Sequence, residues 1–307
     1  MAFVYPKAYF GDGLTATPEA TLSVTSAAVL YGLSVYTVLP VHLTREGAPV
    51  AFRLADHYRR LVNSARIIGI DTFEPVWDEA RFVAAVTQVV LANEVREDVF
   101  VRVSVHVSEE VPGTRSRGIA TTVSMFVYRA EPILPLDGCR LKTSVWRRIP
   151  DYSIPSRAKV NGAYVNSVLA KQDAIDSGYD DCIFLDASGH VCELSAANIF
   201  IVREGVLITP STAQDLLEGI NRHTVLEIAE ALGVPSHERE VDLTELYIAD
   251  EVFACGTSTY VAPVVEVDAR AVNGRAMGPV TALLRGEYEG VLRGEGELGA
   301  RFVTRLG

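Results

Sequence analysis

The 307-residue chain has few lysines: Lys7, Lys142, Lys159 and Lys171 are the only four among its 28 lysine and arginine residues. It has no run of basic residues, and its formal net charge is -11, so we do not expect it to bind nucleic acid. Its apolar stretches are shorter than the roughly 18–20 residues that a membrane-spanning helix needs, and its N-terminus lacks a signal-peptide pattern. These features predict a soluble protein of the cytoplasm without a membrane partner.

The sequence also lacks the residue spacings of metal sites and disulfide frameworks. Its four cysteines, Cys139, Cys182, Cys192 and Cys255, never occur as CxxC, and its six histidines form no HExxH or HxH motif. We therefore expect reduced, largely buried thiols and no metal site.

The first half of the chain carries both strand and helix signals. Residues 26–43 contain many β-branched and aromatic residues around Gly32, which predicts strands. Apolar residues at helical spacing predict one helix within 52–70 and a second over 78–94, with Asp78 as its N-cap. Residues 99–108 alternate between apolar and other side chains, as expected of a half-buried strand.

The second half predicts a helix over about 162–177, a hairpin within 180–202, a helix from Gly219 to Gly233 and a final helix near Pro279. A stretch with two prolines and a glycine, residues 129–139, has no periodicity and predicts a linker. The predicted architecture is α+β in two domains, a small one over 1–128 and a larger one over 140–307.

Lys159 lies among small residues in "SIPSRAKVNGAYVNS". A partly buried lysine can lose its proton and attack a carbonyl group, whereas arginine stays protonated. A lysine in a chain that otherwise uses arginine is therefore a candidate nucleophile, although a single lysine can also be retained without any chemical role.

Two loops and one helix could bind an anion. Gly219 precedes a predicted helix in "LEGIN", so the amides of Ile220 and Asn221 are available to a ligand. "CGTST", at residues 255–259, offers further amides and hydroxyls, and Arg60 could add a positive charge. Each of these features could instead be purely structural.

Two further side chains, Glu193 and Tyr164, are candidates for binding a cofactor. Glu193 lies in an apolar strand, where it could pair with an arginine or with a protonated ring nitrogen, and Tyr164 could bind a phenolate or pack in a core. Pyridoxal phosphate needs a lysine, an acid at its pyridine nitrogen, a donor to O3′ and a phosphate site. Together the residues fit this cofactor.

The chain resembles the class IV (fold type IV) aminotransferases, and in particular their branched-chain amino acid group. The likeness runs from "YGLSV" to "GPVT" and is carried by "IPSRAKVNGAY", "ELSAANIF", "LLEGINR" and "LYIADEVFACGTSTYVAPV". The resemblance implies the two-domain α+β fold of the D-amino acid aminotransferase type, pyridoxal 5'-phosphate as cofactor and a homodimer or higher homo-oligomer.

The resemblance also implies roles for individual residues. Lys159 would be the catalytic Schiff-base lysine and would move the proton of the substrate Cα, while Glu193 would hold the pyridine nitrogen protonated. Tyr164 would bind O3′ and Leu217 would pack on the ring. The remaining cofactor-binding candidates are Arg60, Asn198, Gly219, Ile220, Asn221, Gly256 and Thr257.

The motifs that bear on substrate choice do not all point to the same group of enzymes. Branched-chain enzymes typically carry "YGxSVFEGIR" and "YIRP", but this chain has "YGLSVYTVLP" and "FVRV", so Phe100 lacks a hydroxyl while Arg102 is kept. The string "VYTV" is similar to (R)-selective amine transaminases. The candidate substrate-binding residues are Tyr31, Tyr36, Val38, Phe100, Arg102, Thr257 and Ser258.

From the lysine-side motifs we expect amino-group transfer between a branched-chain L-amino acid and a 2-oxo acid such as 2-oxoglutarate. The alternatives are an (R)-selective amine or D-amino acid:pyruvate transaminase, an aminodeoxychorismate lyase, and a family member without catalytic activity.

Overall fold

The computed structural model describes residues 3–110 and 113–307. The chain forms two compact units. The first consists of Met1–Glu131, Ala158–Ala163 and Val291–Gly307, and the second of Pro132–Arg157 and Tyr164–Gly290. Each unit is therefore built from stretches that are separated in the sequence.

The domain division expected from sequence stays a prediction. It differs from the two units chiefly at residues 158–163 and 291–307, which lie in the first unit although they follow the predicted linker. Lys159 is one of these residues.

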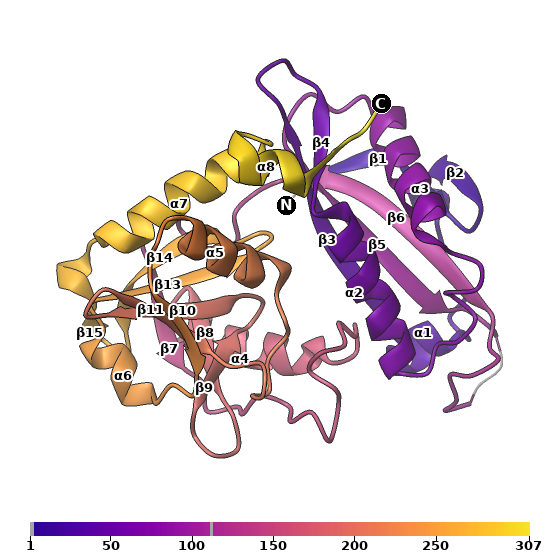
Figure 1. The fold of residues 1–307 in the computed structure, drawn as a ribbon. Coiled ribbons are helices and arrows are strands. Elements are labelled where there is room, and N and C mark those ends of the chain that lie inside the picture. Colours follow the sequence, from indigo (N-terminus) through magenta and orange to yellow (C-terminus); the bar gives the residue numbers. More distant parts are fainter. Residues whose placement is uncertain (1–2, 111–112) are drawn as a thin grey trace. The chain divides into compact units, whose positions relative to one another are not determined.

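The first unit contains an antiparallel seven-stranded sheet in the order β16-β4-β3-β5-β6-β1-β2 (Figure 1). Its strands are β1 (Val4–Phe10), β2 (Gly13–Ala16), β3 (Ser34–Leu43), β4 (Pro49–Phe52), β5 (Val99–Val107), β6 (Thr121–Arg129) and β16 (Val303–Arg305). Its helices are α1 (Ala27–Tyr31), α2 (Leu54–Ile67), α3 (Glu79–Ala92), α8 (Gly296–Phe302) and the short 3₁₀ helix η1 (Thr17–Glu19).

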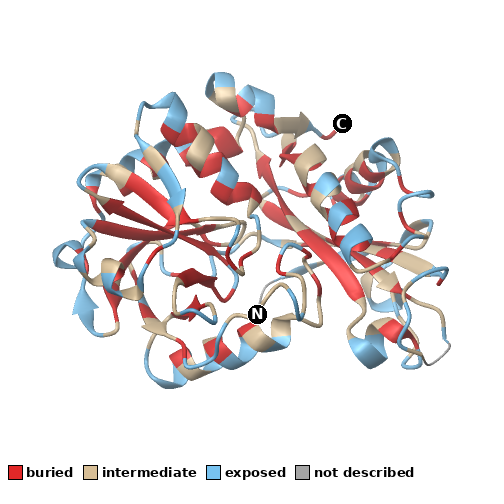
Figure 2. Cartoon of the chain, turned by 60° about the horizontal axis from the view of Figure 1, so that its bottom comes forward, coloured by how far each residue is buried: buried red, intermediate tan, exposed pale blue. Residues whose placement is uncertain are grey.

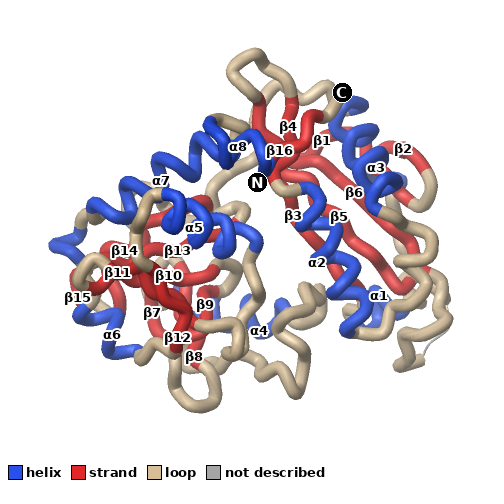
Figure 3. Tube along the Cα trace, in the orientation of Figure 1, coloured by secondary structure: helices blue, strands red, loops and turns tan. Residues whose placement is uncertain are grey.

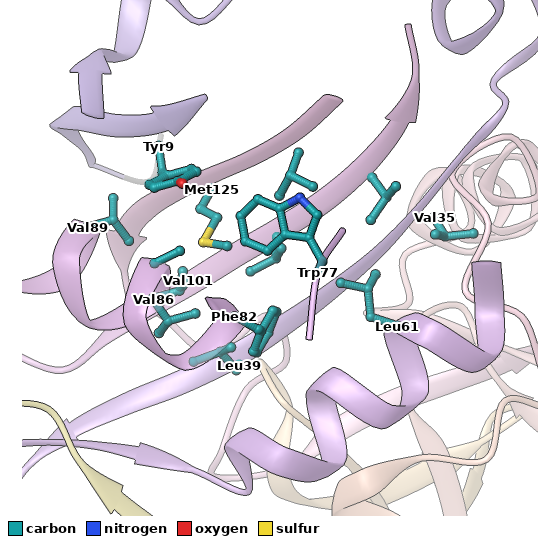
Figure 4. Packing of buried hydrophobic residues seen from close by; sticks show 14 of the residues in the cluster. Tyr9, Val35, Leu39, Leu61, Trp77, Phe82, Val86, Val89, Val101 and Met125 are labelled. Atoms are coloured by element: carbon teal, nitrogen blue, oxygen red, sulfur yellow. The ribbon is translucent and has the colours of Figure 1, made fainter. Parts of the chain in front are cut away.

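Helices α2 and α3 cover one face of this sheet, and Figure 4 shows the core that they form with it. Leu61 of α2 and Phe82 of α3 are fully buried there with Leu39 of β3. The odd-numbered residues of β5, Val99 to Val107, belong to the same core. Because successive strand residues point to opposite faces, Phe100, Arg102, Ser104 and His106 share the other face.

The second unit contains a nine-stranded sheet in the order β12-β11-β10-β13-β14-β7-β8-β9, with β15 beside β14. Its strands are β7 (Cys139–Thr143), β8 (Asp181–Leu185), β9 (Val191–Leu194), β10 (Asn198–Arg203), β11 (Val206–Pro210), β12 (Ser236–Arg239), β13 (Glu251–Gly256), β14 (Tyr260–Val267) and β15 (Arg270–Ala271). Strands β3 and β5 of the first unit and β8, β9, β10 and β13 of the second are mostly buried, and Figure 2 shows buried strands in each unit.

The helices of the second unit (Figure 3) are α4 (Tyr164–Asp176), α5 (Ile220–Ala231), α6 (Leu243–Ile248), the 3₁₀ helix η2 (Asn273–Arg275) and α7 (Pro279–Leu292), whose last two residues lie in the first unit. The buried Glu251 caps α7 by accepting hydrogen bonds from the amides of Val280 (3.0 Å) and Thr281 (2.7 Å). A carboxylate is favourable there because the N-terminal end of a helix is positive.

Several element predictions are confirmed. Asp78 accepts a hydrogen bond from the Arg81 amide at 2.7 Å and caps α3, and α7 begins at Pro279. The helices predicted over 162–177 and from Gly219 to Gly233 are α4 and α5. All four cysteines are buried free thiols, also as predicted.

One local prediction is wrong, and another is only partly right. Residues 27–31, expected in a strand, form α1, which ends because Gly32 adopts a left-handed conformation with φ +65°. A Cβ at Gly32 would lie 2.8 Å from the Gly162 Cα, so the position also requires the small residue. Strand β5 alternates as predicted, but Ser104 on its second face is only 4% exposed, so the strand is more than half-buried. Among the described residues, no helix is long and apolar enough to cross a membrane.

Candidate active site

The Lys159 backbone is fixed by two elements of the first unit. Its amide donates a hydrogen bond to Ser64 Oγ of α2 at 3.1 Å, and its carbonyl accepts one from the Tyr36 amide of β3 at 3.0 Å. The Lys159 Nζ lies 4.9 Å from the centre of the Tyr36 ring. The amine therefore sits beside an aromatic face at a defined place on the sheet.

Arg102 contacts the same ring, with its Cζ 3.7 Å from the Tyr36 ring centre. Its Nη2 donates a hydrogen bond to Asn161 Oδ1 at 2.6 Å, and Asn161 Nδ2 donates to Ser34 Oγ at 2.6 Å. The segment that carries Lys159 thus holds the Arg102 guanidinium as well. The sequence did not single out Asn161 or Ser34.

Arg60 lies on α2, and its Nη2 donates a hydrogen bond to Thr37 Oγ1 at 3.0 Å. Thr37 Oγ1 is also 2.7 Å from the Nδ1 of the fully buried His57. Burial, and then the charges of Arg60 and Lys159, lower the pKa of His57 well below its usual 6.5. His57 is therefore a neutral imidazole at physiological pH.

The other substrate-binding candidates of the first unit are Val38, Tyr31 and Phe100. Val38 stands opposite Arg102 in the β3–β5 register, and Tyr31 ends α1 with 47% of its surface exposed. Phe100 is fully buried, and its ring centre lies 5.6 Å from that of Tyr128 on β6. Tyr128 is a residue that the sequence did not indicate.

In the second unit, Glu193 lies on β9 and is only 6% exposed. Its Oε1 is 2.9 Å from Arg148 Nε, and its Oε2 accepts hydrogen bonds from the Leu217 amide (3.2 Å) and Asn198 Nδ2 (3.3 Å). A cation and two N–H donors all favour the ionised carboxylate. The sequence left two partners open for this glutamate, an arginine or a ring nitrogen, and an arginine is in fact present.

The start of α5 is built around Gly219. A Cβ at this position would lie 2.0 Å from Asn198 Oδ1, so any larger residue here would force Asn198 to move. Asn198 Nδ2 also donates to the Leu217 carbonyl at 3.0 Å. The free amides of the helix N-terminus beyond Gly219, including that of Ile220, are suited to bind an anion.

A chain of hydrogen bonds joins α7, α5 and the loop after β13. The buried Tyr288 hydroxyl donates to Asn221 Oδ1 at 2.7 Å, and Asn221 Nδ2 donates to Thr257 Oγ1 at 3.0 Å. Gly256 ends β13, and in the loop that follows it the carbonyl of Ser258 accepts a hydrogen bond from the Ile133 amide. The partly buried Tyr164 is the first residue of α4.

The residues present fit pyridoxal phosphate. A buried, ionised Glu193 suits a protonated pyridine nitrogen, and the α5 N-terminus with the Thr257 hydroxyl suits a phosphate. Within the first unit the structure brings together Arg60, Lys159, Tyr36 and Arg102. Within the second it brings together Glu193, Asn198, Leu217, Gly219, Asn221 and Thr257.

Residues 34–267 match the family model "Amino-transferase class IV", and the chain belongs to this family. It is a pyridoxal-phosphate-dependent aminotransferase with the two-domain α+β fold of fold type IV, as the sequence predicted.

Individual proteins with the same fold are similar over nearly their whole length. A "Probable branched-chain-amino-acid aminotransferase" of Aquifex aeolicus is 35% identical over 99% of this chain and 97% of its own. The crystal structure of a branched-chain aminotransferase from Thermoproteus uzoniensis with norvaline has a TM-score of 0.93 at 33% identity and covers 99% of this chain and 100% of that one. The T.th. branched-chain amino acid aminotransferase complexed with N-(5'-phosphopyridoxyl)-L-glutamate has a TM-score of 0.92 at 31% identity and covers 99% of both chains.

Proposed function

We propose that this enzyme transfers the amino group between a branched-chain L-amino acid and a 2-oxo acid such as 2-oxoglutarate. The observation that carries the proposal is the full-length similarity to branched-chain aminotransferases, one of them solved with norvaline and another with a glutamate adduct of the cofactor. Norvaline is an aliphatic amino acid, and glutamate is the amino form of 2-oxoglutarate. The two complexes therefore represent the two kinds of substrate that the proposed reaction exchanges.

Bound pyridoxal phosphate supplies an electron sink that stabilises negative charge at the substrate Cα. The protein's own part is to hold the reacting groups and move protons. We propose that Lys159 Nζ would take the proton from the substrate Cα and deliver it to C4′ of the cofactor. The fixed backbone of Lys159 and the place of its Nζ beside the Tyr36 ring support this role, because a general base must be held in a defined position.

Glu193 would hold a proton on the pyridine nitrogen, and its ion pair with Arg148 supports this role because a neighbouring cation favours the ionised carboxylate. Tyr164 would donate to O3′, and Leu217 would pack on the ring. Arg60 and the Gly219–Asn221 turn, with Gly256 and Thr257, would bind the phosphate.

The substrate carboxylate would bind to Arg102 and to the amides of the Thr257–Ser258 loop. Tyr31, Tyr36, Val38 and Phe100 would contact the rest of the substrate. The rigid support of Arg102 by Asn161 favours this role, because a guanidinium held in one direction loses less entropy on binding a carboxylate.

We further propose that the enzyme acts in the cytoplasm as a homodimer. Helix α4 supports the second part of this proposal, since it exposes a row of apolar residues, Val165, Val168, Leu169 and Ile175, that a second copy could cover. Light scattering of the purified protein tests it, and a monomer mass would contradict it.

The test of the substrate is a half-reaction without an oxo acid. L-leucine, D-alanine and (R)-1-phenylethylamine are added separately to the yellow holoenzyme while its visible absorption is followed. Fast loss of the yellow colour with L-leucine supports the proposal.

Conversion with the (R)-amine or D-alanine alone would contradict the proposal. It would make the enzyme an (R)-amine or D-amino acid transaminase, an outcome that the Tyr36, Thr37, Val38 and Phe100 departures favour.

A further inference from the structure

Thr37 is fully buried in β3 and lies between two residues of α2 that are one helical turn apart. Its Oγ1 is 3.0 Å from Arg60 Nη2 and 2.7 Å from His57 Nδ1. Branched-chain enzymes typically have glutamate at this place in their motif, so the hydroxyl is a departure of this chain from that motif.

The hydrogen-bonding protons of Thr37, Arg60 and His57 can be counted. A threonine hydroxyl has one proton to donate and two lone pairs, and a guanidinium can only donate. Arg60 therefore occupies a lone pair of Oγ1. Within the described chain the remaining side-chain partner of this hydroxyl is His57 Nδ1. Which of the two atoms donates depends on the imidazole tautomer, and the hydroxyl can donate its proton to this partner only if Nδ1 is unprotonated.

A bond from the hydroxyl to Nδ1 leaves fewer groups unpaired than the reverse one, in which the hydroxyl proton would have no side-chain acceptor among the described residues. Nδ1 must be unprotonated to accept the bond, which places the single ring proton on Nε2. Nε2 is buried and has no hydrogen-bond partner among the described residues. A charged imidazole would instead donate from Nδ1 to Thr37, and the threonine hydroxyl would then have to turn its own proton away from the ring.

We propose that Thr37 is the positioning residue of Arg60: its hydroxyl, oriented by the neutral His57, sets the direction of the guanidinium toward the cofactor phosphate. This inference rests on the proposed function, in which Arg60 binds that phosphate. A carboxylate at position 37 would orient Arg60 too, but it would also offset the positive charge that attracts the phosphate. The hydroxyl orients Arg60 without doing so.

The binding test compares two ligands of the full-length apoenzyme, pyridoxal 5'-phosphate and pyridoxal, which lacks the phosphate. Thr37→Val should weaken binding of pyridoxal phosphate about tenfold, as expected for one lost hydrogen bond to a charged group, and leave pyridoxal binding unchanged. Thr37→Ser should restore wild-type binding. Equal affinity of Thr37→Val and wild type, or an equal loss for both ligands, would overturn the proposal.

Two control variants separate the possible failures. Thr209→Val removes another buried strand hydroxyl, which bonds only a backbone carbonyl, and should leave both affinities unchanged. Arg60→Gln tests the role of Arg60 itself. If it does not lower the affinity for pyridoxal phosphate relative to pyridoxal, the proposed role of Arg60 fails; if it does and Thr37→Val does not, only the present inference fails.

A second measurement uses the unchanged protein. ¹⁵N NMR of the imidazoles, with His57 assigned by its loss in His57→Gln, should show a proton on Nε2 and no titration from about pH 5.5 to 8. A proton on Nδ1, or a titration in this range, would overturn the proposal even if Thr37→Val did not fold.

Discussion

Arg148 and Glu193 form a buried ion pair, in which Nε lies 2.9 Å from Oε1 and the side chains are 13% and 8% exposed. Because removal of one partner leaves an uncompensated buried charge, Arg148→Gln should lower the free energy of unfolding by about 3 kcal/mol. Urea denaturation of the apoenzyme measures this loss. Arg147→Gln is the matched control, since Arg147 is the exposed neighbour, and an equal loss in both variants would contradict a specific pair.

Lys159→Ala should abolish transamination while the fold is kept. We expect the initial rate to fall by at least about a thousandfold, because no other group can take over the amine chemistry, and the unfolding free energy to change by less than about 1 kcal/mol. Steady-state rates and thermal unfolding measure the two effects. Lys7→Ala, at an exposed lysine, should retain full activity, and normal turnover in Lys159→Ala would refute the assignment of Lys159.

Gly219→Ala should disturb Glu193 through Asn198. The new Cβ would lie 2.0 Å from Asn198 Oδ1, so the asparagine must move and weaken its bonds to Glu193 and to the Leu217 carbonyl. We expect reduced affinity for pyridoxal phosphate. In an Asn198→Ala background the same glycine change should cost at least about 0.5 kcal/mol less, as expected for residues in contact, and strict additivity of the two changes would argue against the clash.

Asp98 should make the first unit sensitive to acid. Its carboxylate binds His42 Nδ1 (3.0 Å), Arg293 Nη2 (2.7 Å) and the Leu43 amide (3.0 Å), and these bonds outweigh burial and hold the pKa of Asp98 well below its usual range. Since the folded pKa is the lower one, the stabilisation is present above the unfolded value of about 3.9 and is lost as pH falls below it toward the folded pKa.

The comparison of Asp98→Asn with the wild type tests this dependence. The variant should be less stable in urea at pH 7, and the difference should shrink as the pH is lowered below about 4. A difference that stays constant across this range would show that Asp98 does not act through its charge.

The sequence predicted those features that depend on local chemistry. Asp78 caps α3 and Pro279 opens α7 because caps and prolines act within one helical turn. Residues 27–31 were predicted wrongly because the β-forming composition of the wider stretch 26–43 hid a short segment rich in the helix formers alanine and leucine. The left-handed Gly32, which ends this helix, closely approaches Gly162, a contact across more than a hundred residues.

The same limit applies to the candidate site. Lys159 and Glu193 stand out by residue type and setting, and the family motifs supply the rest of the cofactor candidates. The residues that support these side chains could not be predicted from the sequence. Arg148 is one arginine among many, and Thr37 gains its meaning only from its distances to His57 and Arg60.

The first unit draws on three stretches of the chain, and its edge strand β16 is made from residues 303–305. A ribosome releases these stretches at widely separated times. The segment that carries Lys159 and the strand that completes the sheet emerge long after β1 to β6, so the first half of the protein cannot finish folding while it is being synthesised. The first unit is therefore complete only after residues 291–307 have been made.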